Sequence, residues 1–342
     1  MLTIEKFRGC VIGQCVGDTL GMSVEKQPLA ICTEYAAQLQ RGNLDVWCHP
    51  NFAFGQYTDD SQLMREMLIS FVACEGLSPD DYGRRIGRLY ANNTIVGSSR
   101  AGRKVAERIN GGMPWKESGT PAPYASNGSS MRAAPIGLFF GKAPEKLIQA
   151  ACEQGYITHQ DPRASAGAVV IAGAVAIAIQ SQEIVPGQFL QNLKPLVQKV
   201  DSSFGEALEQ LSNVIDLPLG AAREKIARMG NPPPRYKSWE GISPWVIPSV
   251  LWSLYSFLQS PHDHWETICT AISGGGDTDT TAAMAGAVSG AFLGLDAVPT
   301  RVSHQLTDQG KWEYQQLLAL ADLGFYVASN HGFADETIAR GI

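Results

Sequence analysis

Apolar residues recur every three or four positions through most of the chain, the spacing that places them on one face of an α-helix. The clearest example follows Thr58, where apolar side chains occupy positions 63, 64, 67, 68, 71 and 72. Alternating apolar and polar runs joined by tight turns, which are typical of β-strands, are scarce. The pattern therefore predicts an all-α protein of a dozen or more helices. Besides the helix after Thr58, these are expected near 3–20, 78–90, 99–110, 143–154, 162–182, 187–200, 218–229, 245–259, 264–272, 279–293 and 308–323.

No segment has the composition of a flexible linker between domains. Residues 231–239 are rich in proline, but they are few, include two aromatic residues and lie between apolar segments, so they predict a rigid surface loop. We therefore expect residues 1–342 to form one compact multi-helix domain. Residues 164–182 carry no charge and approach the length of a transmembrane helix. Their alanine-rich composition favours a central buried helix of a soluble protein, with no membrane partner.

Composition and charge exclude several classes of protein. Apolar residues make up 44% of the chain and charged residues 18%, which argues against disorder. The net charge of −6 argues against a broad nucleic-acid surface. Seven scattered cysteines without a Cys-x-x-Cys pair indicate a reducing compartment, and the N-terminus is a poor signal sequence, so we expect a cytoplasmic protein. Cys10 and Cys15 are expected to be small core residues.

Glycines recur at intervals of four residues near both ends of the chain. They lie at positions 9, 13, 17 and 21, and again at 286, 290 and 294. Residues four apart share one face of a helix, so each set forms a stripe that allows another backbone to approach closely. Each stripe runs next to an acidic segment, the first of which contains Asp18 and Glu25. The pattern predicts that the two ends of the chain meet around a site.

Two further acidic segments open predicted helices and carry more oxygen atoms than helix capping needs. Residues 57–60 are Tyr-Thr-Asp-Asp, and residues 273–281 are Ser-Gly-Gly-Gly-Asp-Thr-Asp-Thr-Thr. A single Asp or Thr there is an ordinary N-cap, but adjacent carboxylates repel each other unless a cation screens them. Oxygen ligands without Cys or His suit Mg²⁺, Mn²⁺ or Ca²⁺ rather than zinc. The two segments together predict a site with room for two ions.

Five segments resemble the ADP-ribosylglycohydrolase family, which includes dinitrogenase-reductase-activating glycohydrolase and the ADP-ribosyl-acceptor hydrolases. In chain order they are FRGCVIGQCVGDTLGMSVE, YTDD, SNGSSMRAAPIG, THQDPRASAG and GGGDTDTTAAMAGAVSGAFLG. They span nearly the whole chain and follow the family's order. The resemblance implies an all-α fold of the ADP-ribosylglycohydrolase type and a centre of two Mg²⁺ or Mn²⁺ ions. The metal ligands that it implies are Thr58, Asp59, Asp60, Asp277, Asp279 and Thr280.

The resemblance also implies roles for other polar residues. Candidates for moving a proton are Glu25, Asp60 and Asp277. Candidates for binding substrate are Gly97, Ser98, Ser126, Asn127, Gly128 and His159. Candidates for stacking on adenine are Tyr124, Trp115, Tyr236 and Trp239. Two nearby residues have simpler interpretations: Asp161 is expected to be a helix N-cap, and Arg132 a structural hydrogen-bond donor.

The function implied is metal-dependent hydrolysis of the bond at C1″ of an ADP-ribosyl group. The substrate would be an ADP-ribosylated protein, modified on arginine or serine, or a small ADP-ribose derivative; the leaving group and the oligomeric state stay open. One alternative is a two-metal phosphatase acting on ADP-ribose-1″-phosphate or a related nucleotide, because two ions serve an in-line displacement equally well. Another is a non-catalytic protein that binds ADP-ribose. The presence of all six implied metal ligands argues against this second alternative.

Overall fold

The computed structural model describes residues 2–330, and within them the chain is all-α. Seventeen α-helices and four short 3₁₀ helices occur in this part, and β-structure is limited to isolated bridges. The α-helices are α1 (Ile4–Gly21), α2 (Leu29–Gln40), α3 (Asp59–Cys74), α4 (Pro79–Ala91), α5 (Arg100–Asn110), α6 (Trp115–Ser118), α7 (Ala134–Phe140), α8 (Pro144–Tyr156), α9 (Pro162–Gln180), α10 (Pro186–Val197), α11 (Ser202–Ser212), α12 (Leu219–Ile226), α13 (Val246–Gln259), α14 (His264–Ser273), α15 (Thr278–Leu293), α16 (Thr300–Ser303) and α17 (Tyr314–Asn330). The all-α prediction is confirmed.

Most predicted helices lie within a few residues of their expected bounds, but the last one does not. A helix was expected over 308–323, whereas α17 runs from Tyr314 to Asn330. Residues 308–313 instead form a turn fixed by tertiary contacts. Asp308 accepts a hydrogen bond from Arg65 at 2.7 Å, and the Tyr57 hydroxyl donates to the Trp312 carbonyl at 3.1 Å. The pattern also missed α2, α6, α7, α11 and α16.

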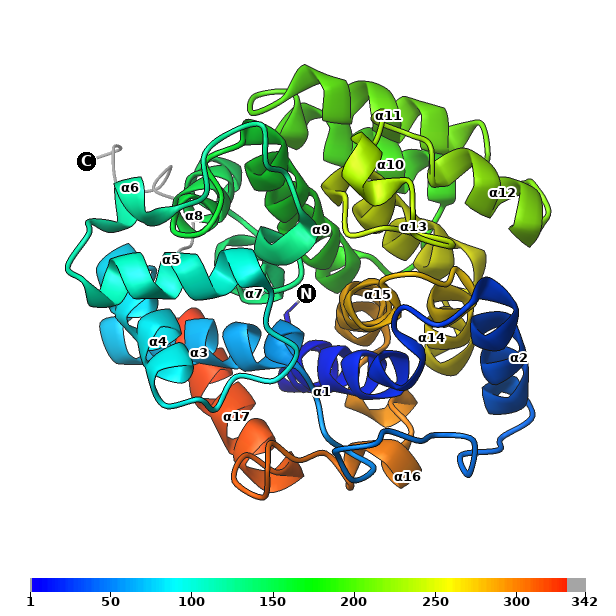
Figure 1. Cartoon of the computed structure of the whole chain (residues 1–342), viewed down its shortest axis with the longest axis horizontal. Coiled ribbons are helices and arrows are strands. Elements are labelled where there is room, and N and C mark those ends of the chain that lie inside the picture. Colours follow the sequence, from blue (N-terminus) through cyan, green and yellow to red (C-terminus); the bar gives the residue numbers. More distant parts are fainter. Residues whose placement is uncertain (1, 331–342) are drawn as a thin grey trace.

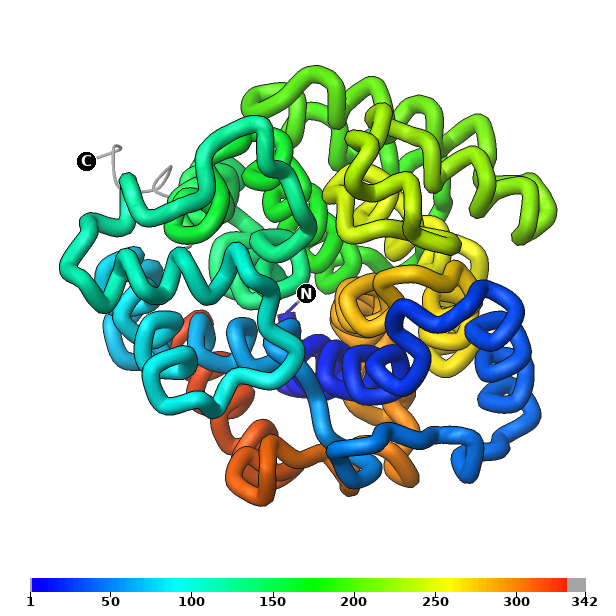
Figure 2. Tube along the Cα trace, in the orientation of Figure 1, coloured from blue at the N-terminus to red at the C-terminus, as the bar shows by residue number. Residues whose placement is uncertain are grey.

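The two glycine stripes face each other along α1 and α15, so the predicted meeting of the chain ends is confirmed. A Cβ on Gly17 would lie 2.1 Å from the Ala282 carbonyl oxygen, and one on Gly290 would lie 2.0 Å from the Gly9 carbonyl oxygen. Neither position tolerates a side chain without a shift of the backbone. The two helices lie side by side near the centre of the molecule (Figures 1 and 2). They run antiparallel, because Gly9 contacts Gly290 and Gly21 contacts Thr278, so the end of α1 meets the start of α15.

The alanine-rich segment forms α9, and the prediction of a central buried helix is confirmed. This helix has the length and hydropathy of a membrane span, but 83% of its most apolar window is buried inside the molecule. Asp161 is its N-cap, as expected, and accepts a hydrogen bond from the Arg163 amide at 3.1 Å. α9 packs against α7, α8, α10 and α15 and thereby joins the two halves of the chain.

Candidate active site

The end of α1 and the start of α15 bring three carboxylates together. The Thr278 hydroxyl donates to the Gly21 carbonyl at 2.8 Å, and the Lys26 amide donates to the Gly276 carbonyl at 2.9 Å. These bonds fix the chain just after α1 against the loop that leads into α15. As a result, carboxylate oxygens of Glu25, Asp277 and Asp279 lie within 4.8 Å of one another.

Asp18, on the last turn of α1, holds the start of α3 beside this group. Its carboxylate is fully buried and accepts hydrogen bonds from the Thr58 amide at 3.0 Å, the Thr58 hydroxyl at 2.8 Å and the Ser61 amide at 3.0 Å. The Thr58 hydroxyl also lies 3.1 Å from Asp60 Oδ2. One acidic residue of α1 therefore positions Asp59 and Asp60, which open α3.

A connecting segment before α13 joins the loop at Asn127 to the loop that precedes α15. The Asn127 amide donates to the Pro244 carbonyl at 3.0 Å, and the Asp277 amide donates to the Ile242 carbonyl at 2.8 Å. Gly276 has a φ of +77°, and a Cβ there would lie 2.1 Å from the Ile242 carbonyl oxygen, which explains why a glycine precedes Asp277. The Asn127 side chain then donates to Asp277 Oδ2.

The acidic residues line one end of a cavity of about 360 Å³, within the range of small-molecule sites. Twelve of the predicted site residues line it: Glu25, Asp59, Asp60, Gly97, Ser98, Ser126, Asn127, Gly128, His159, Asp277, Asp279 and Thr280. Thr58 lies behind Asp60 and does not line the cavity. Of the predicted stacking aromatics, Tyr124, Tyr236 and Trp239 line the cavity and Trp115 does not.

Burial and mutual repulsion raise the pKa values of the clustered carboxyl groups. Burial, followed by the charges of Asp18 and Glu25, raises the pKa of Asp59 to about 8. Burial and Glu25 raise the pKa of Asp277 to about 7, against the opposing effect of the Asn127 hydrogen bond. Asp60 and Asp279 have pKa values well above the ordinary range for the same reasons. Asp60 Oδ1 is buried with no hydrogen-bond partner.

These residues fit divalent cations. Each raised pKa reflects a carboxylate that lacks water and faces like charges, and a bound cation would remove both penalties. The buried Asp60 Oδ1 has no hydrogen-bond partner, and a cation bound there would satisfy it. The predicted ligands offer carboxylate and hydroxyl oxygens and neither Cys nor His, which suits a hard cation.

At the other end, His159 is held in one orientation by its neighbours. Its Nε2 lies 2.7 Å from the Ser126 hydroxyl and its Nδ1 lies 2.7 Å from the Thr158 hydroxyl. The Tyr124 ring stacks on the imidazole at 5.7 Å between centroids, with 17° between the planes. Burial and the nearby Arg132 lower the pKa of His159 to about 3, so the ring is neutral. It therefore acts as a hydrogen-bonding group, not as a cation.

Arg132 supports this end of the cavity, and its predicted structural role is confirmed. Its side chain is 1% exposed and donates to Gln154 Oε1 at 2.8 Å and to the Thr158 hydroxyl at 2.8 Å. Thr158 in turn contacts His159. The guanidinium thus anchors the orientation of the imidazole through one intervening hydroxyl.

Lys26 and Trp239 close the acidic end of the cavity. The Lys26 ammonium forms an ion pair with Glu25 and lies over the Trp239 ring at 5.5 Å from its centroid. Lys26 has a φ of +61°, a backbone conformation that is uncommon for a residue other than glycine. Its pKa is raised, since the opposing effect of burial is outweighed by the charges of Glu25, Asp279 and Asp277.

The model of the ADP-ribosylglycohydrolase family matches residues 2–332 of the chain. The chain belongs to the ADP-ribosylglycohydrolase family. It is therefore a member of a family of hydrolases. Human ADP-ribosylhydrolase ARH3 is 25% identical to it over 330 residues, which cover 87% of this chain and 88% of ARH3. An uncharacterized protein of Archaeoglobus fulgidus is 29% identical over 309 residues, which cover 89% of this chain and 92% of that protein.

A solved structure supports the fold of this family member. The structure, described as an ADP-ribosylglycohydrolase-related protein complex, superposes with a TM-score of 0.68 over 95% of this chain and 98% of that chain. The identity is 22%, so the likeness concerns the fold alone. Together the two kinds of comparison agree with the expected all-α architecture.

Sequence reasoning missed two parts of this family member's site. Asp18 was noticed as acidic, but its role in holding α3 depends on contacts across 40 residues of sequence, which no local pattern reveals. Lys26 was missed because a lone lysine beside an acidic residue is common on protein surfaces. Its positive φ offers no signal either, since lysine is not a residue typical of that conformation.

Proposed function

We propose that the protein is a hydrolase that depends on Mg²⁺ or Mn²⁺ and releases ADP-ribose from an ADP-ribosylated protein or a small ADP-ribose derivative. The observation that carries the proposal is the cavity itself. It places buried carboxylates from three separate segments at one end and a glycine-containing loop with a neutral histidine at the other. Family membership supplies the reaction class, and the mouse and human relatives are named ADP-ribosylhydrolases.

Two divalent ions would be held by the six predicted ligands, which are Thr58, Asp59, Asp60, Asp277, Asp279 and Thr280. Such ions supply Lewis-acid activation of a water molecule and binding of a ribose diol. The Thr58 hydroxyl has one proton, so when it donates to Asp18 its lone pairs stay available. Asn127 orients Asp277 by donating a hydrogen bond to Oδ2.

The remaining lining residues would orient the nucleotide. Gly97 has a φ of +80° beside Asp59, and Gly128 lies against the His159 ring, so a diphosphate can approach the backbone at both loops. Ser126, fixed by His159, offers its hydroxyl to a ribose or phosphate oxygen. Tyr124 lies at the same end between neighbours, with His159 stacked on its ring and the Arg235 guanidinium 5.1 Å from its centroid, and an adenine base would join this stack by displacing the guanidinium.

The bond at C1″ would then lie over the acidic end of the cavity. Positive charge develops on the ribose ring as a glycosidic bond breaks, and nearby carboxylates stabilise it. Glu25 is the candidate to accept a proton from the attacking water, because it lies within the carboxylate group, is 25% exposed and pairs with the exposed Lys26 ammonium.

The test is product analysis on three substrates: ADP-ribosyl-arginine protein, ADP-ribosyl-serine peptide and ADP-ribose-1″-phosphate. Each is incubated with EDTA, Mg²⁺ or Mn²⁺, and ADP-ribose and phosphate are quantified by chromatography. Asp279→Asn removes one buried carboxylate, and Asp296→Asn is the matched control because Asp296 is exposed and remote from the cavity. Loss of one repelling charge should leave Asp279→Asn folded.

We expect release of ADP-ribose with Mg²⁺ or Mn²⁺, none with EDTA, and none in Asp279→Asn, while Asp296→Asn behaves as the wild type. Turnover of ADP-ribose-1″-phosphate alone, to ADP-ribose and phosphate, with no ADP-ribose from the protein or the peptide and with the oxygen of ¹⁸O-labelled water in the phosphate, would replace the glycosidic hydrolase by a phosphatase. Binding of ADP-ribose with no turnover of any substrate would contradict the hydrolase altogether.

A further inference from the structure

A second cavity lies beside the candidate active site and shares a wall with it. Its volume is about 640 Å³, and Tyr236 and Trp239 line both cavities. Tyr236 is buried against Trp245, at 5.6 Å between ring centroids, so the wall is fixed to the core. Residues 231–239 therefore do more than link two helices: they separate two neighbouring binding spaces.

The two cavities have opposite charge. The first contains five carboxylates: Glu25, Asp59, Asp60, Asp277 and Asp279. The second is lined by three cations, Arg223, Arg228 and Lys237, and by one carboxylate, Glu224. Arg228 and Lys237 are exposed, and within residues 2–330 no carboxylate forms an ion pair with either. A basic hollow at this place stands out in a chain of net charge −6.

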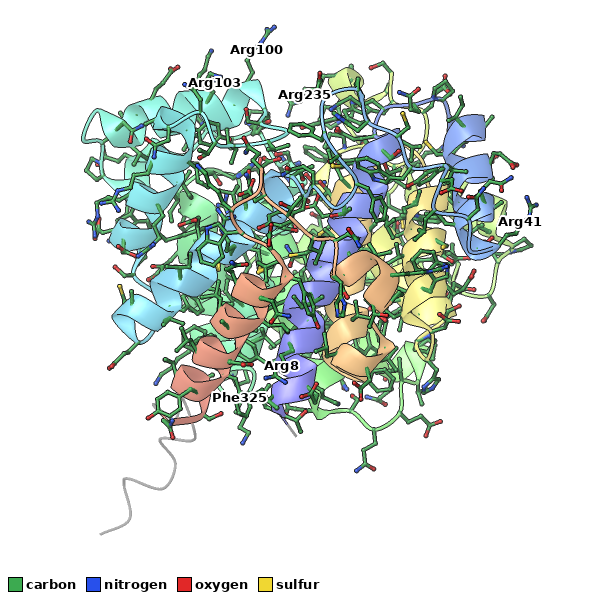
Figure 3. The ribbon with its side chains drawn as sticks, turned by 90° about the horizontal axis from the view of Figure 1, so that it is seen from below. Arg8, Arg41, Arg100, Arg103, Arg235 and Phe325 are labelled. Atoms are coloured by element: carbon green, nitrogen blue, oxygen red, sulfur yellow. The ribbon has the colours of Figure 1, made fainter. Side chains whose placement is uncertain are left out.

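More basic residues border the mouth of the first cavity. Arg100, Arg103 and Arg235 project from the same face of the molecule in Figure 3. α5 carries the first two and lines the cavity through Ala101 and Gly102. An acidic macromolecule that approaches this face therefore meets positive charge on both sides of the cavity.

The position of Trp239 indicates which part of a substrate would reach the second cavity. Trp239 lies under Lys26, and Lys26 pairs with Glu25 in the carboxylate group. The proposed function requires C1″ of the ribose to lie over that group. The acceptor, which is the leaving group of the reaction, would then lie next to Trp239. The second cavity thus adjoins the acceptor side of the scissile bond.

We propose that the second cavity binds an acidic segment of the acceptor protein, with Asp or Glu residues flanking the ADP-ribosylated side chain. The inference rests on the proposed function. Arg228 and Lys237 would pair with the carboxylates, and the Trp239 side of the wall would pack against the acceptor backbone. The Arg228 guanidinium can pair with a carboxylate through two parallel hydrogen bonds, and the Lys237 ammonium is a point charge on a flexible stem, so both suit the carboxylates of a peptide.

The experiment compares two ADP-ribosyl-serine peptides that differ only in their flanks. One carries Asp and Glu near the modified serine, and the other carries Asn and Gln at the same positions. Dissociation constants are measured by fluorescence anisotropy in EDTA and low salt for both peptides and for free ADP-ribose. The kcat and KM values follow with Mg²⁺. The double variant R228Q/K237Q is compared with R41Q/K311Q, which removes two exposed cations that line neither cavity.

We expect the wild type and R41Q/K311Q to bind the acidic peptide about three- to tenfold more tightly than the neutral one, since two partly exposed ion pairs contribute modestly. R228Q/K237Q should abolish this ratio and leave the affinity for free ADP-ribose unchanged. The effect should appear in KM and decline with salt.

Three results would overturn the proposal: no preference for the acidic peptide in the wild type, a preference that persists in R228Q/K237Q, or an equal loss of affinity for free ADP-ribose in that variant. The last would assign the cavity to the nucleotide instead. Absence of ADP-ribose release from both peptides contradicts a serine linkage within the proposed function, and the affinity ratio in EDTA still decides the role of the cavity.

Discussion

The antiparallel contact between α1 and α15 makes a strong prediction about Gly17. In Gly17→Ala, the new methyl group would lie 2.1 Å from the Ala282 carbonyl oxygen and 2.5 Å from its carbon. Both atoms belong to backbone, so neither can rotate away, and the helices must separate. Overpacking of this kind costs about 1–3 kcal/mol, and a contact this short belongs at the upper end of that range. Alanine gains about 1 kcal/mol over glycine in a helix interior. The net expectation is a loss of about 2 kcal/mol in the free energy of unfolding.

Gly220→Ala is the matched control for this substitution. Gly220 also lies in a helix, α12, but a Cβ there meets no atom within 4 Å. The same chemical change should therefore be neutral or stabilising by up to about 1 kcal/mol. Urea denaturation measures both variants under the same conditions.

Separation of the two helices should also have a functional consequence. Glu25 follows α1 and Asp277 precedes α15, so a wider gap at Gly17 moves the carboxylates apart. Gly17→Ala should bind Mn²⁺ more weakly, whereas Gly220→Ala should bind it as the wild type does. If Gly17→Ala is as stable as Gly220→Ala, the close approach of the two helices is not what holds the site together.

Three further substitutions test separate parts of the structure. Asp18→Asn, measured by urea denaturation, should lose about 1–3 kcal/mol, because an amide cannot accept all the hydrogen bonds from Thr58 and Ser61; unchanged stability would refute its role in holding α3. Lys26→Met removes a cation beside Glu25, so it should lower the melting temperature in EDTA but tighten Mn²⁺ binding several-fold. Lys311→Met is the control, and equal changes in that variant would show that any loss of positive charge has the same effect. Burial lowers the pKa of His264 to about 4 from an ordinary value of about 6.5, so the unfolded chain binds a proton that the folded chain does not. The neutral His264 ring therefore contributes fully to the free energy of unfolding above about pH 6.5, and this contribution falls by up to about 1.4 kcal/mol per pH unit as the pH is lowered toward 4. In His264→Leu the free energy of unfolding should change less with pH between 6.5 and 4. Parallel curves for the wild type and the variant would contradict this.

The sequence predicted those features whose physical cause is local. Glycines four residues apart allow a second helix to approach that face of the helix closely. The close contact between α1 and α15 could therefore be predicted from the spacing of Gly13, Gly17 and Gly286. The doubled carboxylates at 59–60 and at 277–279 indicated a shared site because no single helix end needs so many acceptors.

Other features depend on contacts between distant segments and left no signal in the sequence. α17 begins at Tyr314 and not, as predicted, at residue 308, because Asp308 pairs with Arg65, which lies 243 residues earlier. The connecting segment at Ile242 positions both Asn127 and Asp277 through backbone hydrogen bonds, and a backbone bond carries no residue preference. The wall between the two cavities likewise arises from the packing of Tyr236, which its proline-rich surroundings did not indicate.

The central claim is that the buried carboxylates bind divalent ions on which ADP-ribose release depends. Its most direct test is a titration of the metal-free protein with Mg²⁺ and Mn²⁺, in which heat of binding, melting temperature and ADP-ribose release are measured on the same preparation. The buried carboxylates of α3 and α15 should bind the ions, and binding should raise the melting temperature and restore release. Asp279→Asn should lose all three responses, and Asp296→Asn should keep them. Release of ADP-ribose in EDTA at the rate seen with metal, or the same ion affinity in Asp279→Asn, would contradict the account.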